Sequence, residues 1–187
     1  MAGITISRQM GSLGRQVAEE TARKLNFRMV WRDLINQAAR RAGVPEVALA
    51  TIDELGILGI KPSRADQQAY HKAVRQVMME LATEGDVVIV GRAGQVILQD
   101  VPGFLHVRVF APKEVRVTRI MQENGITHDA ALAMIEKSDQ SRAQYLQQNY
   151  HVNLNDPGLY DLMINSHRYT VEAAADLICM GLGKLSE

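Results

Sequence analysis

Short runs of apolar residues, many of them β-branched, recur along the chain and are separated by longer amphipathic stretches. The runs are ITIS at 4–7, FRMV at 27–30, DVVIVG at 86–91, FLHVRVFA at 104–111 and YDLMINS at 160–166. Short apolar runs that alternate with amphipathic helices are typical of a mostly parallel sheet covered on both faces. The pattern therefore predicts an α/β fold in one domain, 1–187, with ITIS as a central strand.

Helical spacing fills the segments between these runs. The predicted helices follow the first run from about 14 to 25 and then occupy about 34–39, 65–83, 112–125, 127–145 and 171–180. Pro112 suits a first helical turn, Gly125 suits a helix end, and Thr127 suits an N-cap. Residues 43–64 contain Gly56, Gly59 and Pro62 and are interpreted as a loop-rich insertion, and DPG at 156–158 as a turn.

Composition limits the classes of function. The 21 basic and 21 acidic side chains give a formal net charge of zero, so no global field would draw the chain to nucleic acid or to an anionic membrane. One cysteine excludes an internal disulfide, and no apolar stretch has the length of a membrane span. With no signal-peptide pattern at the N-terminus, we expect a cytoplasmic location.

The stretch SRQMGSLGRQ at 7–16 lies between the first apolar run and a predicted helix, which is the layout of a phosphate-binding loop. It departs from the standard G-x-x-x-x-G-K-[ST]. Gly14 fits the second glycine, but Arg15 stands at the lysine position and Gln16 at the hydroxyl position. Gln9 stands at the position of the first glycine.

Such a loop suits phosphate because backbone N–H groups gather at the positive end of a helix dipole. The predicted cradle is Gly11, Ser12, Leu13, Gly14, Arg15 and Gln16. Arg15 keeps a positive charge, whereas Gln16 lacks the hydroxyl that usually holds magnesium, so phosphates, waters or another side chain must hold the metal. On the loop alone, an ordinary glycine turn between a strand and a helix is an equal alternative.

Motifs in the second half of the chain favour the phosphate loop. They are VVIVGRAGQVIL at 87–98, VRVFAPKEVRVTRI at 107–120, KSDQSRAQYL at 137–146 and YDLMINSHRYTVEAAADLI at 160–178. With the glycine loop, this ordered set resembles the cytidylate kinase-like family of P-loop phosphotransferases, which is similar to the nucleoside monophosphate kinases. The resemblance implies a P-loop NTPase-type three-layer α/β/α fold with a five-stranded parallel sheet. It also implies an acceptor-binding lobe over 32–75 and a lid over 124–155.

The resemblance also supplies candidate residues. Cytidylate kinases carry a G-R-D triplet whose arginine and aspartate contact the acceptor nucleotide. Here the triplet is Gly91, Arg92 and Ala93, so the arginine is retained and the acid is lost. The pair Asp139 and Arg142 matches a D-x-x-R motif whose arginine bridges the acceptor and the transferred phosphate.

Each candidate has a plainer alternative. Asp139 and Arg142 also fit a surface ion pair three residues apart, worth about 0.2–0.5 kcal/mol. Arg116 and Arg119 are candidates for contacting the nucleotide and equally fit a solvated helix face. Further acceptor candidates are Arg32 and Asp33, of which Asp33 also suits a helix cap, and the sole tryptophan, Trp31, is interpreted as core.

Together these observations predict a phosphotransferase that uses ATP and Mg²⁺. It would transfer the γ-phosphate to a nucleoside monophosphate such as CMP or dCMP. Loop amides would hold the donor β-phosphate, and Arg15 would follow the β and γ oxygens. Arg142 would stabilise charge on the migrating group, and Arg92 would orient the acceptor phosphate. Two alternatives stay open: a kinase of the same fold for another phosphorylated or hydroxylated metabolite, and a nucleotide-binding sensor or assembly module with little turnover. Met78 and Met79 on one predicted helix are interpreted as packing residues and are compatible with a homodimer.

Overall fold

A five-stranded parallel sheet forms the centre of the protein. The computed structural model describes residues 2–31, 40–41, 43 and 64–185. The strands are β1 (Gly3–Arg8), β2 (Arg28–Val30), β3 (Val87–Val90), β4 (Phe104–Phe110) and β5 (Leu162–Asn165), in the order β2-β3-β1-β4-β5. Ile4 of β1 pairs with Val88 on one side and Leu105 on the other. The predicted strands and the central place of ITIS are confirmed.

The described helices match most of the predicted ones. They are α1 (Gly14–Leu25), α4 (Arg64–Glu84), α5 (Gly94–Ile97), α6 (Lys113–Asn124), α7 (His128–Tyr150) and α8 (Val171–Leu182), with a single 3₁₀ turn, η1 (Pro157–Leu159), at the predicted DPG turn. Thr127 caps α7 by accepting from the amide of Ala130, as predicted. Pro112 is the N-cap of α6 rather than a first-turn residue, and the short α5 was not predicted. The expected helix at 34–39 and most of the expected insertion lie outside the described residues.

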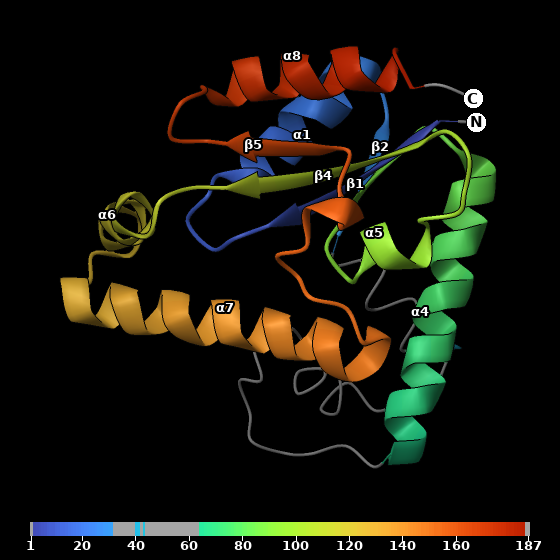
Figure 1. Ribbon diagram of the computed structural model, residues 1–187, viewed down its shortest axis with the longest axis horizontal. Helices are drawn as coiled ribbons and strands as arrows, with labels where there is room; N and C mark the ends of the chain where they lie inside the picture. Colours follow the sequence, from blue (N-terminus) through green and yellow to red (C-terminus); the bar gives the residue numbers. More distant parts are fainter. Residues whose placement is uncertain (1, 32–39, 42, 44–63, 186–187) are drawn as a thin grey trace.

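Helices cover both faces of the sheet (Figure 1). On one face α1 and α8 pack together, and Val17, Ala18 and Ile178 join the core around Ile6 and Val107. On the other face α4 and α5 contribute Tyr70, Val74, Met78 and Ile97, which pack against Val87 and Ile89. Met78 is fully buried while Met79 is exposed, so only Met78 is part of this core. The chain therefore has the three-layer α/β/α arrangement.

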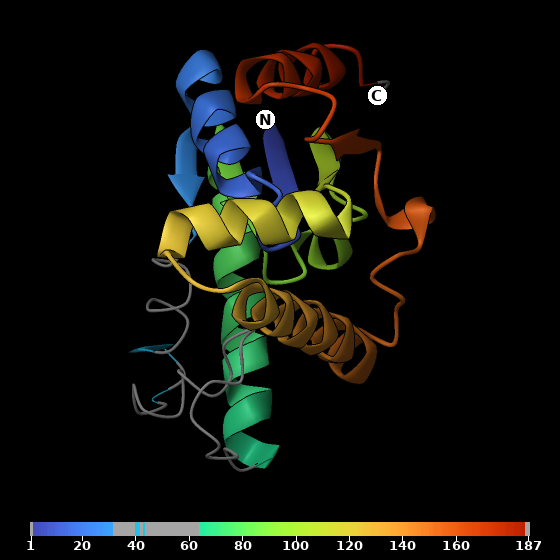
Figure 2. The same cartoon turned by 90° about the vertical axis from the view of Figure 1, so that its left-hand side faces the viewer.

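The carboxyl ends of the strands meet α6 and α7. These helices pack against each other through Val117, Ile120, Ala131 and Ile135, with Met10 of the glycine loop beside them (Figure 2). The chain leaves β1 towards the β2 edge of the sheet and leaves β3 towards the β4 side. In open α/β sheets, ligands bind outside the carboxyl ends of the strands where such connections diverge.

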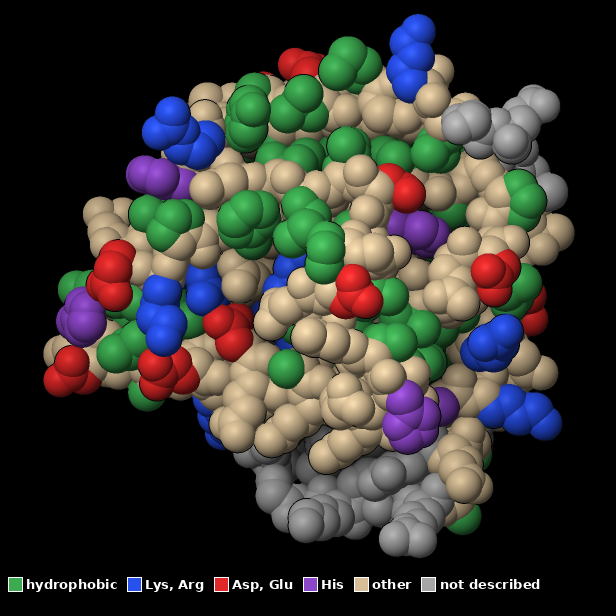
Figure 3. All heavy atoms as spheres, in the orientation of Figure 1, with side chains coloured by type: hydrophobic (Ala, Val, Ile, Leu, Met, Phe, Trp, Pro, Cys, Tyr) green, Lys and Arg blue, Asp and Glu red, His purple; other side chains and the backbone are tan. Residues whose placement is uncertain are grey.

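The face seen in Figure 3 mixes basic and acidic side chains and shows no field of a single sign, in agreement with the zero net charge. None of the helices within the described ranges has the length and apolar character needed to cross a membrane.

Candidate active site

The glycine loop is a compact turn anchored to the sheet. Its Ser12 amide and hydroxyl both donate to the Gln9 carbonyl, at 3.3 and 2.8 Å. The Gln9 side chain accepts from the Ala111 amide at 3.2 Å, just beyond β4. Gln9, which departs from the standard motif, therefore fastens the loop to the neighbouring strand.

Helix α1 begins at this loop without a side-chain cap. Its N-cap is Leu13, a non-glycine residue in the left-handed region with φ of 58°, and its first turn contains no acidic residue. Within the helix, the Val17 amide donates to the Leu13 carbonyl. The amides before Val17 have no carbonyl partner inside the helix, as at every α-helix start. These unpaired amides make the N-terminal end of α1 electropositive, and such an end suits an anion.

Protein atoms explain why both loop positions are glycine. Gly11 has φ of +75°, and a Cβ placed there would lie 2.8 Å from the Arg116 carbonyl oxygen. A Cβ at Gly14 would lie 2.4 Å from Cβ of Arg8. The loop thus packs directly on α6 and on the end of β1, which brings residues of both elements to the same place.

An open groove runs along the outer side of the loop. Its lining includes Gly11, Gly14, Arg15, Gln16 and Arg119. Arg119 donates to the carbonyl oxygens of Gly11 and Ser166, at 3.2 and 2.8 Å, so it joins the loop to the end of β5. The sequence predicted either a nucleotide contact or a solvated helix face for Arg119. In the structure Arg119 lines the groove.

Arg15 occupies the outer part of this groove. Its side chain is 58% exposed, and its Nε donates to Glu19 at 2.8 Å. Its guanidinium also lies over the Trp31 ring, 5.0 Å from the ring centroid. Trp31 is half-buried against the core and also lines the groove, so the core interpretation holds for only part of its surface.

Arg116 is buried, and the solvated-face alternative is wrong for it. Its guanidinium donates to both carboxylate oxygens of Asp139, at 3.1 and 2.8 Å, and to the Met10 carbonyl at 3.3 Å. Helix α7 approaches α6 closely enough to bury this face, which a helix pattern alone does not reveal. Arg116 connects the loop to α7.

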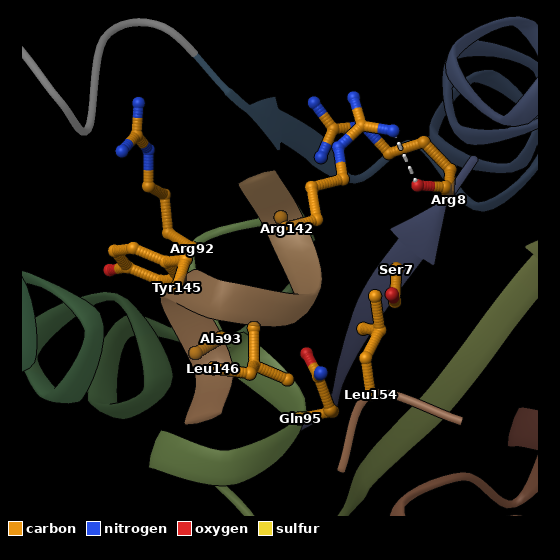
Figure 4. A pocket seen from close by; sticks show the side chains of 10 residues that line it. Ser7, Arg8, Arg92, Ala93, Gln95, Arg142, Tyr145, Leu146 and Leu154 are labelled. Atoms are coloured by element: carbon orange, nitrogen blue, oxygen red, sulfur yellow. Dashed lines mark hydrogen bonds between the residues drawn. The ribbon is translucent and has the colours of Figure 1, made fainter. Parts of the chain in front are cut away.

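A smaller cavity of about 20 Å³, roughly the space of one water molecule, lies beside the loop, at the carboxyl ends of β1 and β3 (Figure 4). Its charged lining residues are Arg8, Arg92 and Arg142. Ala93, Gln95, Tyr145, Leu146 and Leu154 supply much of the remaining lining. Within the described part of the chain, the residues that line this cavity include three arginines and no aspartate or glutamate.

Arg92 is a predicted site residue with an unusual backbone conformation, as Leu13 is. It is 2% exposed and has φ of 56°, and the adjacent Ala93 has φ of 57°. Left-handed non-glycine residues cost roughly 1–3 kcal/mol each and cluster at functional sites. Arg92 directly follows Gly91 at the end of β3, as the sequence predicted.

The charge of Arg92 also shifts the pKa values of three aromatic side chains, His71 on α4 and Tyr145 and Tyr150 on α7. Burial lowers the pKa of His71, and the positive charge of Arg92 lowers it further. Burial raises the pKa of Tyr145 and of Tyr150, while Arg92 opposes both shifts. The ring centroids of His71 and Tyr145 are 5.7 Å apart. Aromatic residues from two helices, α4 and α7, therefore lie near Arg92.

Arg8 and Arg142 line both the groove and the cavity. Arg142 donates to the Arg8 carbonyl at 3.0 Å (Figure 4). Arg142 was predicted for the site and Arg8 was not, although Arg8 is the last residue of the central strand. That position at the ligand edge of the sheet was the signal available from the sequence.

The phosphate loop does not offer a magnesium ion the side-chain hydroxyl of the standard motif. The Ser12 hydroxyl is fully buried and donates to Gln9, and Gln16 has no hydroxyl. Nowhere in the described ranges do three or more His, Cys, Asp or Glu residues gather as they would around a metal. Arg32 and Asp33 lie outside the described residues, and the candidate lobe over 32–75 is described only in part.

The profile of the cytidylate kinase-like family matches residues 3–168. This chain belongs to that family. It is 27% identical over 188 residues to a cytidylate kinase of Methanocaldococcus jannaschii, covering 98% of this chain and 99% of that protein. It is also 26% identical over 147 residues to a uronate isomerase of Corynebacterium glutamicum, but this chain spans only 28% of that protein's length.

Solved structures agree on the fold. An uncharacterised protein from Eubacterium ventriosum superposes with a TM-score of 0.77 at 24% identity, covering 99% of this chain and all of that one. A shikimate kinase from Bacteroides thetaiotaomicron superposes with a TM-score of 0.58 at 17% identity, covering 97% and 98% of the two chains. Family and fold together support a kinase that binds a nucleotide.

Proposed function

We propose that this chain transfers the γ-phosphate of ATP to an acceptor that already carries a phosphate group, with a nucleoside monophosphate such as CMP or dCMP as the first candidate. One observation carries the proposal. The cavity beside the phosphate loop is lined by three arginines and, in its described part, by no carboxylate. The match to cytidylate kinases supports the nucleotide acceptor.

The charge of the cavity favours a phosphate over a hydroxyl as the attacking group. A hydroxyl acceptor loses a proton during transfer and benefits from a positioned base such as an aspartate. A phosphate oxygen is already an anion at neutral pH and needs no base. Guanidinium groups bind phosphate through paired hydrogen bonds and stabilise its charge.

Each element has a role in this reaction. The loop amides from Gly11 to Gln16 and the side chain of Arg15 would hold the donor phosphates in the groove. Arg92, buried at the end of β3, would orient the acceptor phosphate. Arg142, from the predicted lid segment, would stabilise charge on the migrating group. Such positioning and charge neutralisation account for most catalysis of phosphoryl transfer.

A second candidate acceptor is another small phosphorylated metabolite. Ala93 stands where the family pattern has an acid, and it packs with Tyr145, Leu146 and Leu154. This wall of the cavity offers no carboxylate to a base, so it supports an acceptor that is recognised mainly by its phosphate.

The test is transfer from Mg–ATP to matched pairs of acceptors, followed by ³¹P NMR. CMP, dCMP, UMP, AMP and GMP would be compared with their nucleosides, and small sugar phosphates with the free sugars. We expect transfer to phosphorylated acceptors and none to their hydroxyl counterparts. Transfer to cytidine or a free sugar would contradict the proposal. Binding of ATP without transfer to any member would instead favour a sensor module.

A further inference from the structure

Arg8 lies where the donor groove and the acceptor cavity meet. It is the last residue of β1, the central strand, and it pairs in register with Val109 of β4. Of the described residues, Arg8 and Arg142 alone line both spaces. A phosphoryl group that moves from donor to acceptor must pass the wall that these spaces share.

Close packing against Gly14 restrains the side chain of Arg8. Its Cβ lies so near Gly14 that a Cβ on that glycine would be 2.4 Å away, and Cγ of Arg8 would be 3.2 Å away. Its carbonyl oxygen accepts from Arg142 at 3.0 Å. The stem of Arg8 therefore packs against the first residue of α1, and the side chains of Arg8 on β1 and Arg142 on α7 extend towards each other (Figure 4).

Arg15 lies elsewhere, although it occupies the lysine position in the sequence motif. It lines the outer groove but not the cavity that contains Arg92. Its side chain is 58% exposed, pairs with Glu19 and stacks over Trp31. A side chain held there suits the bound donor, whereas a group in transit lies deeper, beside Arg92 and Arg142.

We propose that Arg8, rather than Arg15, is the catalytic residue that supplies the cation following the migrating phosphoryl group, and so performs the task of the absent loop lysine. This inference rests on the proposed function. In the transfer, an acceptor phosphate oxygen bonds to the γ-phosphorus while the bond from that phosphorus to the β–γ bridging oxygen breaks. ADP leaves with the electron pair, and no proton is moved. Arg8 from β1 and Arg142 from α7 neutralise the charge on the three oxygens of the transferred group.

The decisive variants separate the charge of Arg8 from its packing. Arg8→Gln keeps a polar stem beneath Gly14 and removes the charge, and Arg8→Lys keeps the charge and removes the planar fork. Arg15→Ala tests the rival residue. Arg28→Ala is the matched control, because Arg28 is an exposed arginine paired with Glu84 outside both spaces. Circular dichroism and thermal melting would verify that each variant is folded.

We expect Arg8→Gln to lower kcat about 100-fold or more, as removal of one charge-stabilising donor does in other enzymes. Arg8→Lys should restore part of that loss. Arg15→Ala should lower kcat less than Arg8→Gln and act mainly on ATP and ADP affinity, and Arg28→Ala should match the parent. The inference is overturned if folded Arg8→Gln keeps its kcat, or if Arg15→Ala loses more kcat than Arg8→Gln.

Calorimetric binding of ATP and ADP distinguishes failure of this inference from failure of the proposed function. If the parent transfers phosphate to no acceptor, the proposed function fails, but the position of Arg8 is still tested. Arg8→Gln should then weaken ATP binding more than ADP binding, because only ATP carries the γ-phosphate that Arg8 would contact. An unchanged ratio of the ATP and ADP affinities would show that Arg8 does not contact the γ-phosphate.

Discussion

Asp139 of α7 accepts two hydrogen bonds from the guanidinium of Arg116 on α6, at 3.1 and 2.8 Å. The same guanidinium reaches the Met10 carbonyl in the phosphate loop. Asp139 was a catalytic candidate in the sequence, and this contact suggests a positioning role instead. By holding α7 against the loop, the pair places Arg142, one turn further along, next to Arg8.

The first prediction concerns the stability of this arrangement. Asp139→Asn leaves the Arg116 charge, whose side chain is 4% exposed, without its carboxylate. Loss of one partner from a largely buried pair should lower the free energy of unfolding by about 1–3 kcal/mol, since Asp139 itself is partly exposed. Urea denaturation measures this change.

Glu136→Gln is the matched control for Asp139→Asn. Glu136 also joins α7 to α6, through Lys113 at 3.0 Å, but both side chains are at least half exposed. Exposed pairs of this kind contribute about 0–1 kcal/mol, so Glu136→Gln should be nearly neutral. Equal effects of the two substitutions would show that burial of Arg116 does not increase the contribution of its ion pair to the free energy of unfolding.

The second prediction concerns Arg92. Arg92→Ala should lower kcat/KM for the acceptor about ten- to a hundredfold, the loss expected for a charge-assisted hydrogen bond worth roughly 1.5–3 kcal/mol. ATP affinity should stay nearly unchanged, because Arg92 lines the cavity and not the donor groove. Steady-state kinetics at varied acceptor, with calorimetry of ATP binding, would test it. An equal loss of ATP affinity would assign Arg92 to the donor.

The third prediction concerns selection of the base. Ala93 is 2% exposed and packs with Tyr145 and Leu146, so it provides no hydrogen bond to a pyrimidine. Sites that lack such a bond discriminate poorly between analogues. We expect similar kcat/KM values for CMP and UMP, measured side by side. Strong preference for CMP would show that another residue reads the base.

The fourth prediction concerns pH and His106 of β4. Burial lowers the pKa of His106, partly offset by the charge of Asp161 and by a backbone hydrogen bond to Leu98, and its Nδ1 is 2.7 Å from the Thr5 hydroxyl. Because the unfolded chain then binds a proton more readily than the folded one, stability is full above the ordinary histidine pKa of about 6.5. It should fall as pH drops below that value and level off below the folded-state pKa.

Thermal melting at pH 7.5 and pH 5.5 would measure this effect. His106→Gln removes the titrating group, so its melting temperature should fall less between the two pH values than that of the parent. Identical pH dependence in His106→Gln and the parent would contradict the assignment.

Local pattern was sufficient for the architecture. The inner strands β1, β3 and β4 were visible as short apolar runs, since residues on both faces of a covered parallel strand are buried. Thr127 and Gly125 marked helix ends because capping depends on neighbours within a few residues. The place of Arg92 also followed from the sequence, because the end of a buried strand lies at the ligand edge of the sheet.

The partners of charged residues were decided only by tertiary structure. Arg116 is 23 residues from Asp139, Arg8 is 134 residues from Arg142, and nothing in the spacing of either pair indicates a contact. Periodicity reports which face of an element is buried, but not which element buries it. The approach of α7 to α6 and to the loop turned a helix-face arginine into a buried one. It also placed Arg8, a strand end outside the motif, deeper in the site than Arg15.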